Sequence, residues 1–480
     1  MKRSGRAHSR SAPDPRRRAA AARGAGAEGR LELRIDALAA GGAGVARVEG
    51  GVVFIAGAAP GDLAEVDVDR SARTARGKLL RVIEPGPGRV APPCPFVTTC
   101  GGCDWMHLRV EAQEAAHADI VRQAIARATS VRELPAIRVH RAPAPLGYRT
   151  RARLFAAAER GEVRVGYRSQ GTHALAAIDR CLVLSDGLAP LLGDLPEVLR
   201  GATGEGDLLA SLGAGDRPVV EIAWRGELPP AAWKIIDDRV ARGAWAGARV
   251  TLEGASRPAS FGDPNPVVQG ADGRPLVLAP GGFGQPSEQG ASELARRVAE
   301  LARLDASAPA GADPRPAWRR PPHVLELFAG SGTLSILLAR DAALDVEPGS
   351  APGEAPASFV AVERSASAVA CLRRNLEDRG LAGKAVAADA DGYGIPARVD
   401  LVVLDPPRGG ASAAARAIAA SSARAVIYVS CDPATLARDL GHLLEGGRLE
   451  ITDIELIELF PQTSHIETVV RLVRPRRGLR

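Results

Sequence analysis

Two short apolar runs near the carboxyl end of the chain each stop at chemically reactive residues. Residues 401–404 are followed by Asp405 and two prolines, and residues 425–430 are followed by Cys431. Buried parallel strands have this appearance when they deliver side chains at the carboxyl edge of a sheet. The pair therefore predicts an α/β domain in which a carboxyl group and a thiol share one site.

The segment upstream of this pair has the pattern of a doubly wound domain. An apolar strand at 324–328 leads through Gly330 and Gly332 into a helix-forming run, and such a turn lets backbone N–H groups approach a nucleotide-like ligand. Two further predicted strands end in acids, Glu363 and Asp389, and the first of these suits ribose hydroxyls. By topology alone the ligand could be NAD or S-adenosylmethionine.

The motif that begins at Asp405 favours S-adenosylmethionine. Asp-Pro-Pro after an apolar strand occurs in methyltransferases, and its two prolines fix the backbone. Glu363 arrives later than the usual gap of about 20 residues after a glycine turn. We attribute the excess to a loop insertion at 341–358, and we expect a second insertion in the Ala- and Pro-rich residues 305–320.

The cysteines indicate a metal centre. The chain has six, and three of them, Cys94, Cys100 and Cys103, fall within ten residues, which does not suggest a disulfide framework. Cys181 is the better candidate for the fourth ligand, and His107 is the alternative. Four thiolates suit either an iron–sulfur cluster or structural zinc, and spacing alone does not choose between them.

The amino-terminal part predicts a small β-barrel. Residues 30–86 alternate short apolar runs with Gly and Pro turns. The glycine turn at 41–44 and the turn that ends at Asp62 resemble those of a TRAM domain, an OB-like RNA-binding module. Residues 1–29 carry eight Lys and Arg without an apolar pattern. We expect them to be a disordered basic tail, either an arm for RNA phosphates or a solvated tail.

The charge and the apolar content limit the class of protein. A net charge of +6 and a pI of about 9.2 suit a polyanionic partner such as nucleic acid. No apolar run approaches the roughly 20 residues of a membrane span, and the start of the chain lacks the apolar region of a signal peptide. We therefore expect a cytoplasmic protein, with an organelle transit peptide as the alternative interpretation of the Arg-rich start.

The region between the barrel and the doubly wound domain is less informative. Residues 109–130 have helical spacing, and residues 147–155 alternate basic and apolar positions. The aromatic and basic residues here, which include Tyr148 and Tyr167, could form a strand face that stacks on RNA, or a solvated strand face. Residues 200–282 contain strand-like runs whose pairing the sequence does not determine.

Taken together, the motifs resemble the RNA uracil-5 methyltransferase family over residues 30–474. The matching segments are Cys94…Cys100-Gly-Gly-Cys103, Cys181, Phe283-x-Gln285, Phe328-Ala-Gly330-Ser-Gly332, Asp405-Pro-Pro-Arg408, Ser430-Cys431-Asp-Pro-x-Thr435-x-x-Arg438-Asp439 and Phe460-Pro-x-Thr463-x-His465-x-Glu467. The resemblance is greatest to the branch that carries a TRAM domain and a [4Fe-4S] cluster and methylates 23S ribosomal RNA.

This resemblance implies an α/β protein with a Rossmann-like class I methyltransferase domain. A small OB-like β-barrel, the TRAM domain, and a central α+β domain with a four-cysteine metal site are expected before it. The expected boundaries are 1–29 for the tail, 30–87 for the barrel, 88–282 for the central domain and 283–480 for the methyltransferase domain. RNA, above all 23S ribosomal RNA, is the expected partner, with no membrane, and the protein is expected to act as a monomer.

The resemblance also implies a covalent route to methylation of uracil C5. That carbon is a poor nucleophile, and addition of a thiolate to C6 enables it to accept a methyl group. Cys431 matches the nucleophile, and its place before a helix predicts a lowered thiol pKa. Glu467 matches the base that removes the C5 proton. Asp405 is expected to position the uracil or to stabilise charge near it.

Further residues take their expected roles from the same resemblance. The expected contacts of S-adenosylmethionine are Gln285, Phe328, Gly330, Gly332, Glu363, Asp389 and Asp405. The expected ligands of the [4Fe-4S] cluster, or of zinc as the alternative, are Cys94, Cys100, Cys103 and Cys181. Ser287 stands where the family usually has Asn, which puts one cofactor contact in doubt. Cys371 is expected to be structural, and His465 to be a hydrogen-bonding partner.

The residues leave three other functions open. The substrate could be transfer RNA, or the chain could be a catalytically inactive RNA-binding protein on the same scaffold. A third possibility is methylation of another atom, such as an exocyclic amine. The intact Cys431, Asp405 and Glu467 argue against loss of activity, and amine methylation needs no cysteine nucleophile.

Overall fold

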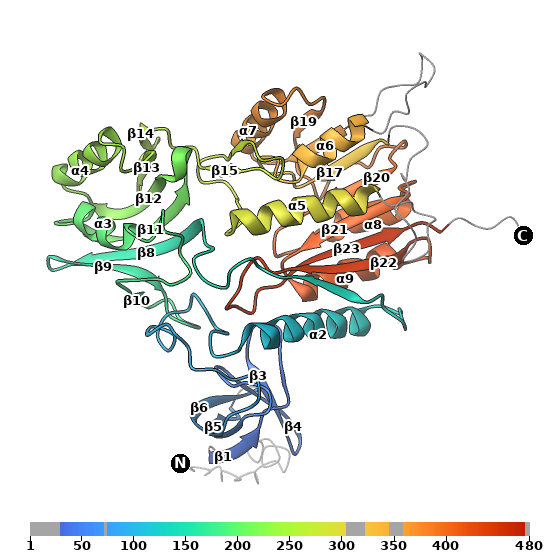
Figure 1. Cartoon of the computed structure of the whole chain (residues 1–480), viewed down its shortest axis with the longest axis horizontal. Helices are drawn as coiled ribbons and strands as arrows, with labels where there is room; N and C mark the ends of the chain where they lie inside the picture. Colours follow the sequence, from blue (N-terminus) through green and yellow to red (C-terminus); the bar gives the residue numbers. More distant parts are fainter. Residues whose placement is uncertain (1–28, 72–73, 304–321, 345–358, 476–480) are drawn as a thin grey trace, which may run out of the picture. The chain divides into compact units, whose positions relative to one another are not determined.

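The computed structural model, drawn in Figure 1, describes residues 29–71, 74–303, 322–344 and 359–475. The chain divides into two compact units, Met1–Arg89 and Val90–Arg480. The predicted basic tail, apart from its last residue, lies outside the described residues. So do the two predicted loop insertions, except for residues 341–344, which belong to helix α6.

The first unit is built on a six-stranded sheet with the order β1-β5-β6-β4-β3-β2. The strands are β1 (Gly29–Arg34), β2 (Ala37–Leu38), β3 (Gly44–Val48), β4 (Gly51–Ile55), β5 (Leu63–Asp69) and β6 (Ala75–Glu84). Alternate side chains point into one apolar core, which includes Leu33, Val53 and Val66. The predicted strand-and-turn pattern of this region is confirmed.

A buried carboxylate fixes the turn before β5. Asp62 is fully buried and accepts hydrogen bonds from the backbone N–H groups of Ala59 (2.7 Å) and Gly86 (2.8 Å). The Arg89 guanidinium also donates to it (2.6 Å). Burial alone would raise the pKa of Asp62, but these donors hold it below its usual value. The turn therefore depends on an ionised Asp62.

The middle of the chain forms a seven-stranded sheet with the order β10-β9-β8-β11-β12-β13-β14. Its strands are β8 (Arg151–Glu159), β9 (Glu162–Arg168), β10 (Leu175–Ala177), β11 (Thr203–Leu212), β12 (Pro218–Glu227), β13 (Gly247–Leu252) and β14 (Ala259–Gly262). Helices α3 (Leu191–Val198) and α4 (Pro230–Ala241) pack into its core through Leu195 and Ile236. This sheet supplies most of the strand pairing that the sequence left open for residues 200–282.

An eight-stranded sheet contains the reactive strand ends, and its order is β19-β18-β17-β20-β21-β23-β22-β7. The strands are β7 (Ile137–His140), β17 (Val324–Leu327), β18 (Phe359–Glu363), β19 (Lys384–Ala387), β20 (Leu401–Leu404), β21 (Ala425–Ser430), β22 (Glu450–Ile457) and β23 (Glu467–Val473). Strands β17 to β21 are parallel, and β23 runs antiparallel to both neighbours. The predicted doubly wound architecture is confirmed. The strand order reverses between β17 and β20, which is where such sheets bind ligands.

Helices flank the eight-stranded sheet. They are α2 (Val110–Ala128), α5 (Glu288–Arg303), α6 (Ser335–Leu344), α7 (Ala366–Glu377), α8 (Ser412–Ala420) and α9 (Pro433–Leu444). Figure 1 shows α5 crossing the strands, and its apolar face, with Leu294 and Val298, packs toward β21, β22 and α6. Helix α2 packs against α9. A two-stranded ribbon, β15 (Val267–Gln269) and β16 (Pro275–Val277), precedes α5.

Strand β7 comes from a part of the chain that precedes the seven-stranded sheet. It nevertheless pairs in parallel with β22, so that Arg138 lies opposite Glu455, 317 residues later. The region predicted as the central domain, 88–282, thus contributes one strand to the sheet of the predicted catalytic domain, 283–480. The chain enters that sheet, leaves to build the seven-stranded sheet, and then returns.

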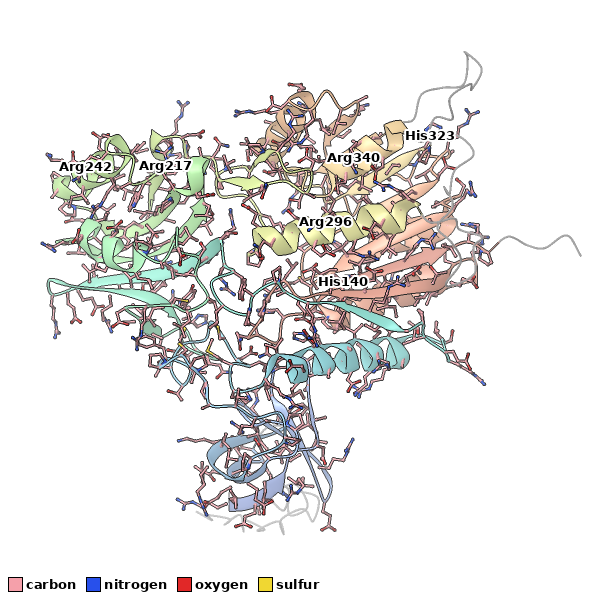
Figure 2. All side chains as sticks on the ribbon, viewed as in Figure 1. His140, Arg217, Arg242, Arg296, His323 and Arg340 are labelled. Atoms are coloured by element: carbon pink, nitrogen blue, oxygen red, sulfur yellow. The ribbon has the colours of Figure 1, made fainter. Side chains whose placement is uncertain are left out.

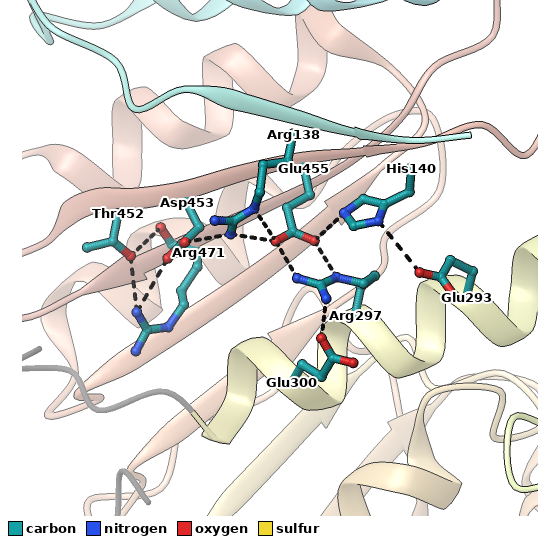
Figure 3. A network of polar contacts seen from close by, with 9 residues as sticks. All are labelled: Arg138, His140, Glu293, Arg297, Glu300, Thr452, Asp453, Glu455 and Arg471. Carbon is teal, nitrogen blue, oxygen red and sulfur yellow. Dashed lines mark hydrogen bonds and ion pairs between the residues drawn. The ribbon is translucent and has the colours of Figure 1, made fainter. Parts of the chain in front are cut away.

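A buried carboxylate joins β7, β22 and α5 (Figure 3). Glu455 is fully buried and accepts hydrogen bonds from the guanidinium groups of Arg138 (2.6 Å) and Arg297 (2.8 Å). His140 Nε2 lies 3.0 Å from the same carboxylate. Burial would raise the pKa of Glu455, but the donors His140, Arg297 and Arg138 together hold it well below its usual range.

Replacement of Glu455 by Gln is expected to destabilise the second unit by about 3 kcal/mol, because the largely buried guanidinium of Arg297 and the half-exposed one of Arg138 lose their buried counter-charge. The midpoint of urea unfolding, followed by tryptophan fluorescence, measures the change. The matched control is Glu300→Gln, since Glu300 also pairs with Arg297 but is about half exposed. Equal effects of the two variants would contradict this prediction. Since the folded pKa is depressed, the contribution of Glu455 is present above the unfolded pKa and is lost as pH falls through the folded one.

A cavity of about 450 Å³ lies beside this network. Its lining includes His140 and Arg296, which Figure 2 labels, and also Glu293. The Nδ1 atom of His140 lies 3.6 Å from the carboxylate of Glu293.

Among the described residues, no helix combines the length and apolar composition needed to cross a membrane.

Candidate active site

A second cavity, of about 810 Å³, opens at the point where the strand order reverses. Eight of the nine residues predicted for catalysis and cofactor binding line it: Gln285, Phe328, Gly330, Glu363, Asp389, Asp405, Cys431 and Glu467. The ninth, Gly332, is not among its lining residues. A cavity of this size suits a ligand larger than a single base.

Cys431 is fixed between a strand and a helix. It follows the last residue of β21, and Asp432 begins α9 as its N-cap. The Asp432 carboxylate accepts hydrogen bonds from the backbone N–H groups of Ala434 (3.0 Å) and Thr435 (2.8 Å). This cap satisfies free N–H groups of the helix and sets the direction in which the chain passes Cys431.

The predicted lowering of the Cys431 pKa is wrong. Burial, and then the neighbouring carboxyl groups of Glu467 and Asp405, raise the pKa of this thiol to about 11. Arg408 acts in the opposite direction but does not compensate. The free protein therefore holds Cys431 as a thiol, and the proton must leave when a substrate or cofactor changes its surroundings.

Alkylation of Cys431 by iodoacetamide is expected to accelerate about tenfold per pH unit between roughly pH 7 and 10, because the thiolate fraction rises in that proportion below the pKa. Peptide mass spectrometry at each pH measures the rate. Cys371, which is buried against Val277 and Ala279, serves as the internal control and should react slowly throughout. A plateau below about pH 9 would show that the pKa is not raised.

Asp405, which is partly buried, and Glu467, which is buried, form a pair of carboxyl groups whose charges interact. Asp405 follows β20, and Glu467 opens β23 and is 3% exposed. Burial raises the pKa of both groups, and the charge of Asp405 raises that of Glu467 further. Because two carboxylates whose charges repel each other do not both ionise readily, the pair retains a proton above the ordinary pH range for carboxyl groups. A carboxylate in such surroundings is a strong base once that proton has left.

The glycine turn after β17 is tied to the end of β18. The backbone N–H of Gly330 donates to one Glu363 carboxylate oxygen (3.1 Å), and that of Ser365 donates to the other (2.7 Å). Phe328 adopts a left-handed backbone with φ of 63°, a costly conformation for a residue with a side chain. At Gly330 a side chain would meet no atom within 4 Å, so the backbone here faces open space.

Gly332 has a packing role instead of a place in the cavity. Its φ of 103° lies in the left-handed region, and an added Cβ would come within 2.7 Å of Leu372 on α7. The glycine therefore allows the turn to approach α7 closely.

Ser287, the departure from the family pattern, does not line the cavity. It is 5% exposed, and its hydroxyl accepts a hydrogen bond from the N–H of Gly290 (3.1 Å) at the start of α5. An added Cβ at Gly290 would lie 2.3 Å from Leu459, so this first turn packs tightly. The Ser287 hydroxyl thus caps a helix in this protein, and the residue lies outside the cavity lining.

Phe283 and Arg408 line the cavity, although the sequence prediction assigned neither residue a role at the site. Phe283 is 71% exposed at the cavity, which is unusual for a large apolar side chain. Arg408 Nη2 lies 3.3 Å from His465 Nε2, so the prediction of His465 as a hydrogen-bonding partner is confirmed. Phe283 and Arg408 both belong to motifs that are visible in the sequence. The exposure of a side chain is a tertiary property that such motifs do not report.

The loop after Asp405 is held by α9. Asp439, fully buried, accepts hydrogen bonds from the Ala411 N–H (2.7 Å) and from the Tyr428 hydroxyl (2.7 Å). Arg438 donates both to Asp439 (2.8 Å) and to the carbonyl of Gly409 (2.9 Å). Arg438 and Asp439, which belong to a motif that matches the family, therefore hold the loop that follows Asp405 in place.

The four predicted ligand cysteines line one pocket. These residues are Cys94, Cys100, Cys103 and Cys181. His107, the alternative ligand, is not among the lining residues. Within the described part of the chain, no grouping of three or more His, Cys, Asp or Glu side chains is tight enough to hold a metal ion as it stands. Burial is the main cause that raises the pKa of Cys103 to about 12.

The prediction of an RNA-facing or solvated strand surface is wrong for the two tyrosines. Tyr148 and Tyr167 are each 8% exposed and pack at the cysteine pocket. The Tyr148 hydroxyl donates to the carbonyl of Pro461 (3.0 Å), and the Tyr167 hydroxyl lies 4.0 Å from Cys181 Sγ. Tyr148 precedes β8 and lies outside a strand. For Tyr167, on β9, the alternation of the sequence does not say which strand face is buried.

Two family models match this chain. The model described as "tRNA (Uracil-5-)-methyltransferase" matches residues 319–475, and the TRAM domain model matches residues 30–80. These ranges include the cavity residues from Phe328 to Glu467 and most of the first unit, respectively.

Curated relatives match over nearly the whole length. The 23S rRNA (uracil(1939)-C(5))-methyltransferase RlmD of Halomonas elongata is 35% identical, covering 96% of this chain and 93% of the relative. The protein of the same name from Edwardsiella ictaluri is 33% identical, covering 89% and 92%. Among solved structures, Pyrococcus abyssi tRNA (uracil-54, C5)-methyltransferase in complex with S-adenosyl-L-homocysteine has the same fold. Its TM-score is 0.68 at 19% identity, covering 92% of this chain and 99% of that one.

Proposed function

Because the chain belongs to the RNA uracil-5 methyltransferase family, we propose that it methylates C5 of a uridine in 23S ribosomal RNA through a transient Cys431–C6 bond. The observation that carries the proposal is one cavity in which a thiol, two carboxyl groups and a glycine turn meet. These are the groups needed for nucleophilic addition, proton removal and binding of a nucleotide-like cofactor.

The chemistry needs a thiolate because uracil C5 is a poor nucleophile. The proton of the Cys431 thiol passes to the solvent, the thiolate adds to C6, and the π electron pair of the C5–C6 bond becomes available at C5. S-adenosylmethionine, when bound, would supply the methyl group that C5 receives and would leave as S-adenosylhomocysteine. Glu467 then takes the C5 proton, and the C6–S bond breaks as the double bond re-forms and the thiolate leaves. Asp405 positions the uracil or balances charge near it.

The cofactor would lie along the glycine turn. Gly330 offers open backbone, and Glu363 and Asp389 stand at the ends of successive strands, where ribose hydroxyls and the adenine edge would be held. Gln285 and Phe328 complete this side of the cavity. The exposed ring of Phe283 offers a surface on which an unstacked base could lie.

We further propose that the four cysteines hold a [4Fe-4S] cluster, with zinc as the alternative. The support is that their thiols line one pocket whose other walls include Phe96, Ile178 and Val183. Such walls exclude water from a cluster, and four thiolates are its usual ligands.

The proposed organisation is a TRAM module at 30–87, a central domain at 88–282 that lends β7, and a methyltransferase domain at 283–480, acting as a monomer. The choice of 23S ribosomal RNA is supported by the names of the relatives. The Pyrococcus abyssi structure has the same fold over 92% of this chain and bears the name of a tRNA enzyme. Fold and domain content therefore do not separate the two RNAs.

The test is mass-spectrometric mapping of 23S and transfer RNA from a strain that lacks the gene. The expected result is loss of one 5-methyluridine from 23S RNA, restored by the intact gene and not by the Cys431→Ala variant. Loss from transfer RNA alone would overturn the ribosomal assignment. Unchanged RNA of both kinds would favour an inactive RNA-binding protein, and loss of a methylated exocyclic amine would point to another target atom.

A further inference from the structure

The segment that leads to Glu467 has no regular structure of its own. Residues 458–466, the base loop, join β22 to β23 and contain neither helix nor strand. Gln462 within it is 7% exposed and has a left-handed φ of 70°. Buried backbone without a ladder must find hydrogen bonds elsewhere, and a strained residue persists only where its surroundings hold it.

Those partners come from the segment that follows the cysteines. The Asp104 carboxylate accepts two hydrogen bonds from Ser464, one from its N–H (2.8 Å) and one from its hydroxyl (2.5 Å). The next residue, Trp105, donates its N–H to the carbonyl of Gln462 (3.0 Å). Asp104 directly follows Cys103, which lines the cysteine pocket. Cys103, which lines the cysteine pocket, and Asp104, which binds the base loop, are thus neighbours in the chain.

Residues of helix α2 also bind the base loop. Gln113 exchanges two hydrogen bonds with Gln462, at 2.9 and 3.1 Å, and its amide also donates to the carbonyl of Leu108 (2.8 Å). His117 lies 3.1 Å from the carbonyl of Thr463 and stacks on Trp105. These contacts fix the middle of the base loop, whereas Asp104 holds the part nearest to Glu467.

The far end of the base loop reaches the cavity. Phe460, His465 and Glu467 all line it, and Ser464 lies three residues before Glu467. The carboxyl group of Glu467 must meet the C5 proton within hydrogen-bond distance, and a misplacement of about 1 Å can reduce a rate by about 10²-fold. A shift of Ser464 would therefore reduce the rate of proton removal from C5.

We propose that Asp104 is a positioning residue, which holds the base loop through Ser464 and makes the placement of Glu467 depend on the order of the cysteine pocket. This inference rests on the proposed function for its catalytic consequence. Its structural part does not, because the hydrogen bonds from Ser464 to Asp104 exist whatever the reaction is.

The test compares Asp104→Ala with Asp104→Asn. Alanine removes both acceptors, so we expect kcat to fall about 10- to 100-fold with little change in KM for RNA. The enzyme should also accumulate as a covalent adduct with methylated RNA, because addition by Cys431 continues while proton removal is slow. Asparagine keeps an oxygen for the Ser464 N–H and can donate to its hydroxyl, so it should restore kcat to within a few-fold of wild type.

Two further measurements distinguish a role of Asp104 in positioning the base loop from a role in holding the cluster. Iron and sulfide content should be the same in wild type and Asp104→Ala, and hydrogen exchange should accelerate at 458–466 but not along α2. Asp119→Ala is the matched control, since it removes an exposed carboxylate that pairs with Arg122 of the same helix, α2. It should change none of these readouts.

The outcomes are distinguishable. Loss of iron in Asp104→Ala together with activity would assign the residue to the cluster and overturn the inference. Unchanged exchange in the base loop, or full activity of Asp104→Ala, would overturn it as well. A wild-type protein that transfers no methyl group to RNA would defeat the proposed function, while the exchange measurement would still decide whether Asp104 holds the loop.

Discussion

Replacement of Cys431 by Ala is expected to reduce methyl transfer to RNA by a factor of about 10⁴ or more. Without the thiol nothing adds to C6, and C5 stays too weak a nucleophile to accept the methyl group. No other cysteine occurs among the described residues that line the cavity, so no second thiol can substitute. Transfer of tritium-labelled methyl groups into 23S RNA measures the loss.

The control for this variant is Cys371→Ala. Cys371 is buried between α7 and the ribbon strand β16, away from the cavity lining, so its loss should leave the rate nearly unchanged. RNA that contains 5-fluorouridine provides a second readout, because fluorine cannot leave C5 as a proton does and the adduct persists. Wild type should form an adduct that survives denaturing electrophoresis, and Cys431→Ala should form none. Methylation by Cys431→Ala would refute the covalent mechanism.

Replacement of Glu467 by Gln is expected to slow turnover about 10²- to 10⁴-fold and to trap the enzyme on its RNA. The amide fills the same buried space but cannot accept the C5 proton. Addition by Cys431 and methyl transfer can still proceed, so a covalent adduct with already methylated RNA should accumulate. Denaturing electrophoresis followed by mass spectrometry of the bound RNA detects it.

The matched control for this variant is Glu450→Gln, an exposed position at the start of neighbouring strand β22, which should behave as wild type. The double variant with Cys431→Ala should show no adduct, because the bond to RNA depends on the thiol. Normal turnover by Glu467→Gln would remove Glu467 from the role of base. A slow variant without an adduct would place the defect before addition.

The reactive strand ends were predictable because parallel strands present their carboxyl ends at one edge. Asp405 and Cys431 follow adjacent strands, β20 and β21, and therefore meet in one cavity. Their chemistry was harder to predict. The pKa of Cys431 depends on burial and on Glu467, a residue from another strand, and these outweigh the expected effect of the following helix.

Long-range pairing was outside the reach of the sequence patterns. Nothing in residues 137–140 identifies β7 as a neighbour of β22, because β7 has only four residues and the interval between the two strands contains a whole second sheet. The burial of Tyr167 on β9 was missed for a related reason. An alternating pattern has two faces, and only the packing partner decides which one meets water.

The late completion of the eight-stranded sheet has a consequence for how the protein is made. Arg138 leaves the ribosome 317 residues before its partner Glu455, an interval of roughly 15–65 s at ordinary synthesis rates. During that time β7 has no strand to pair with, and an unpaired edge invites association with other chains. We expect nascent chains of this protein to need shielding by a chaperone until β22 emerges. A fragment that begins at residue 283 would lack the strand that covers β22 and would be prone to aggregate.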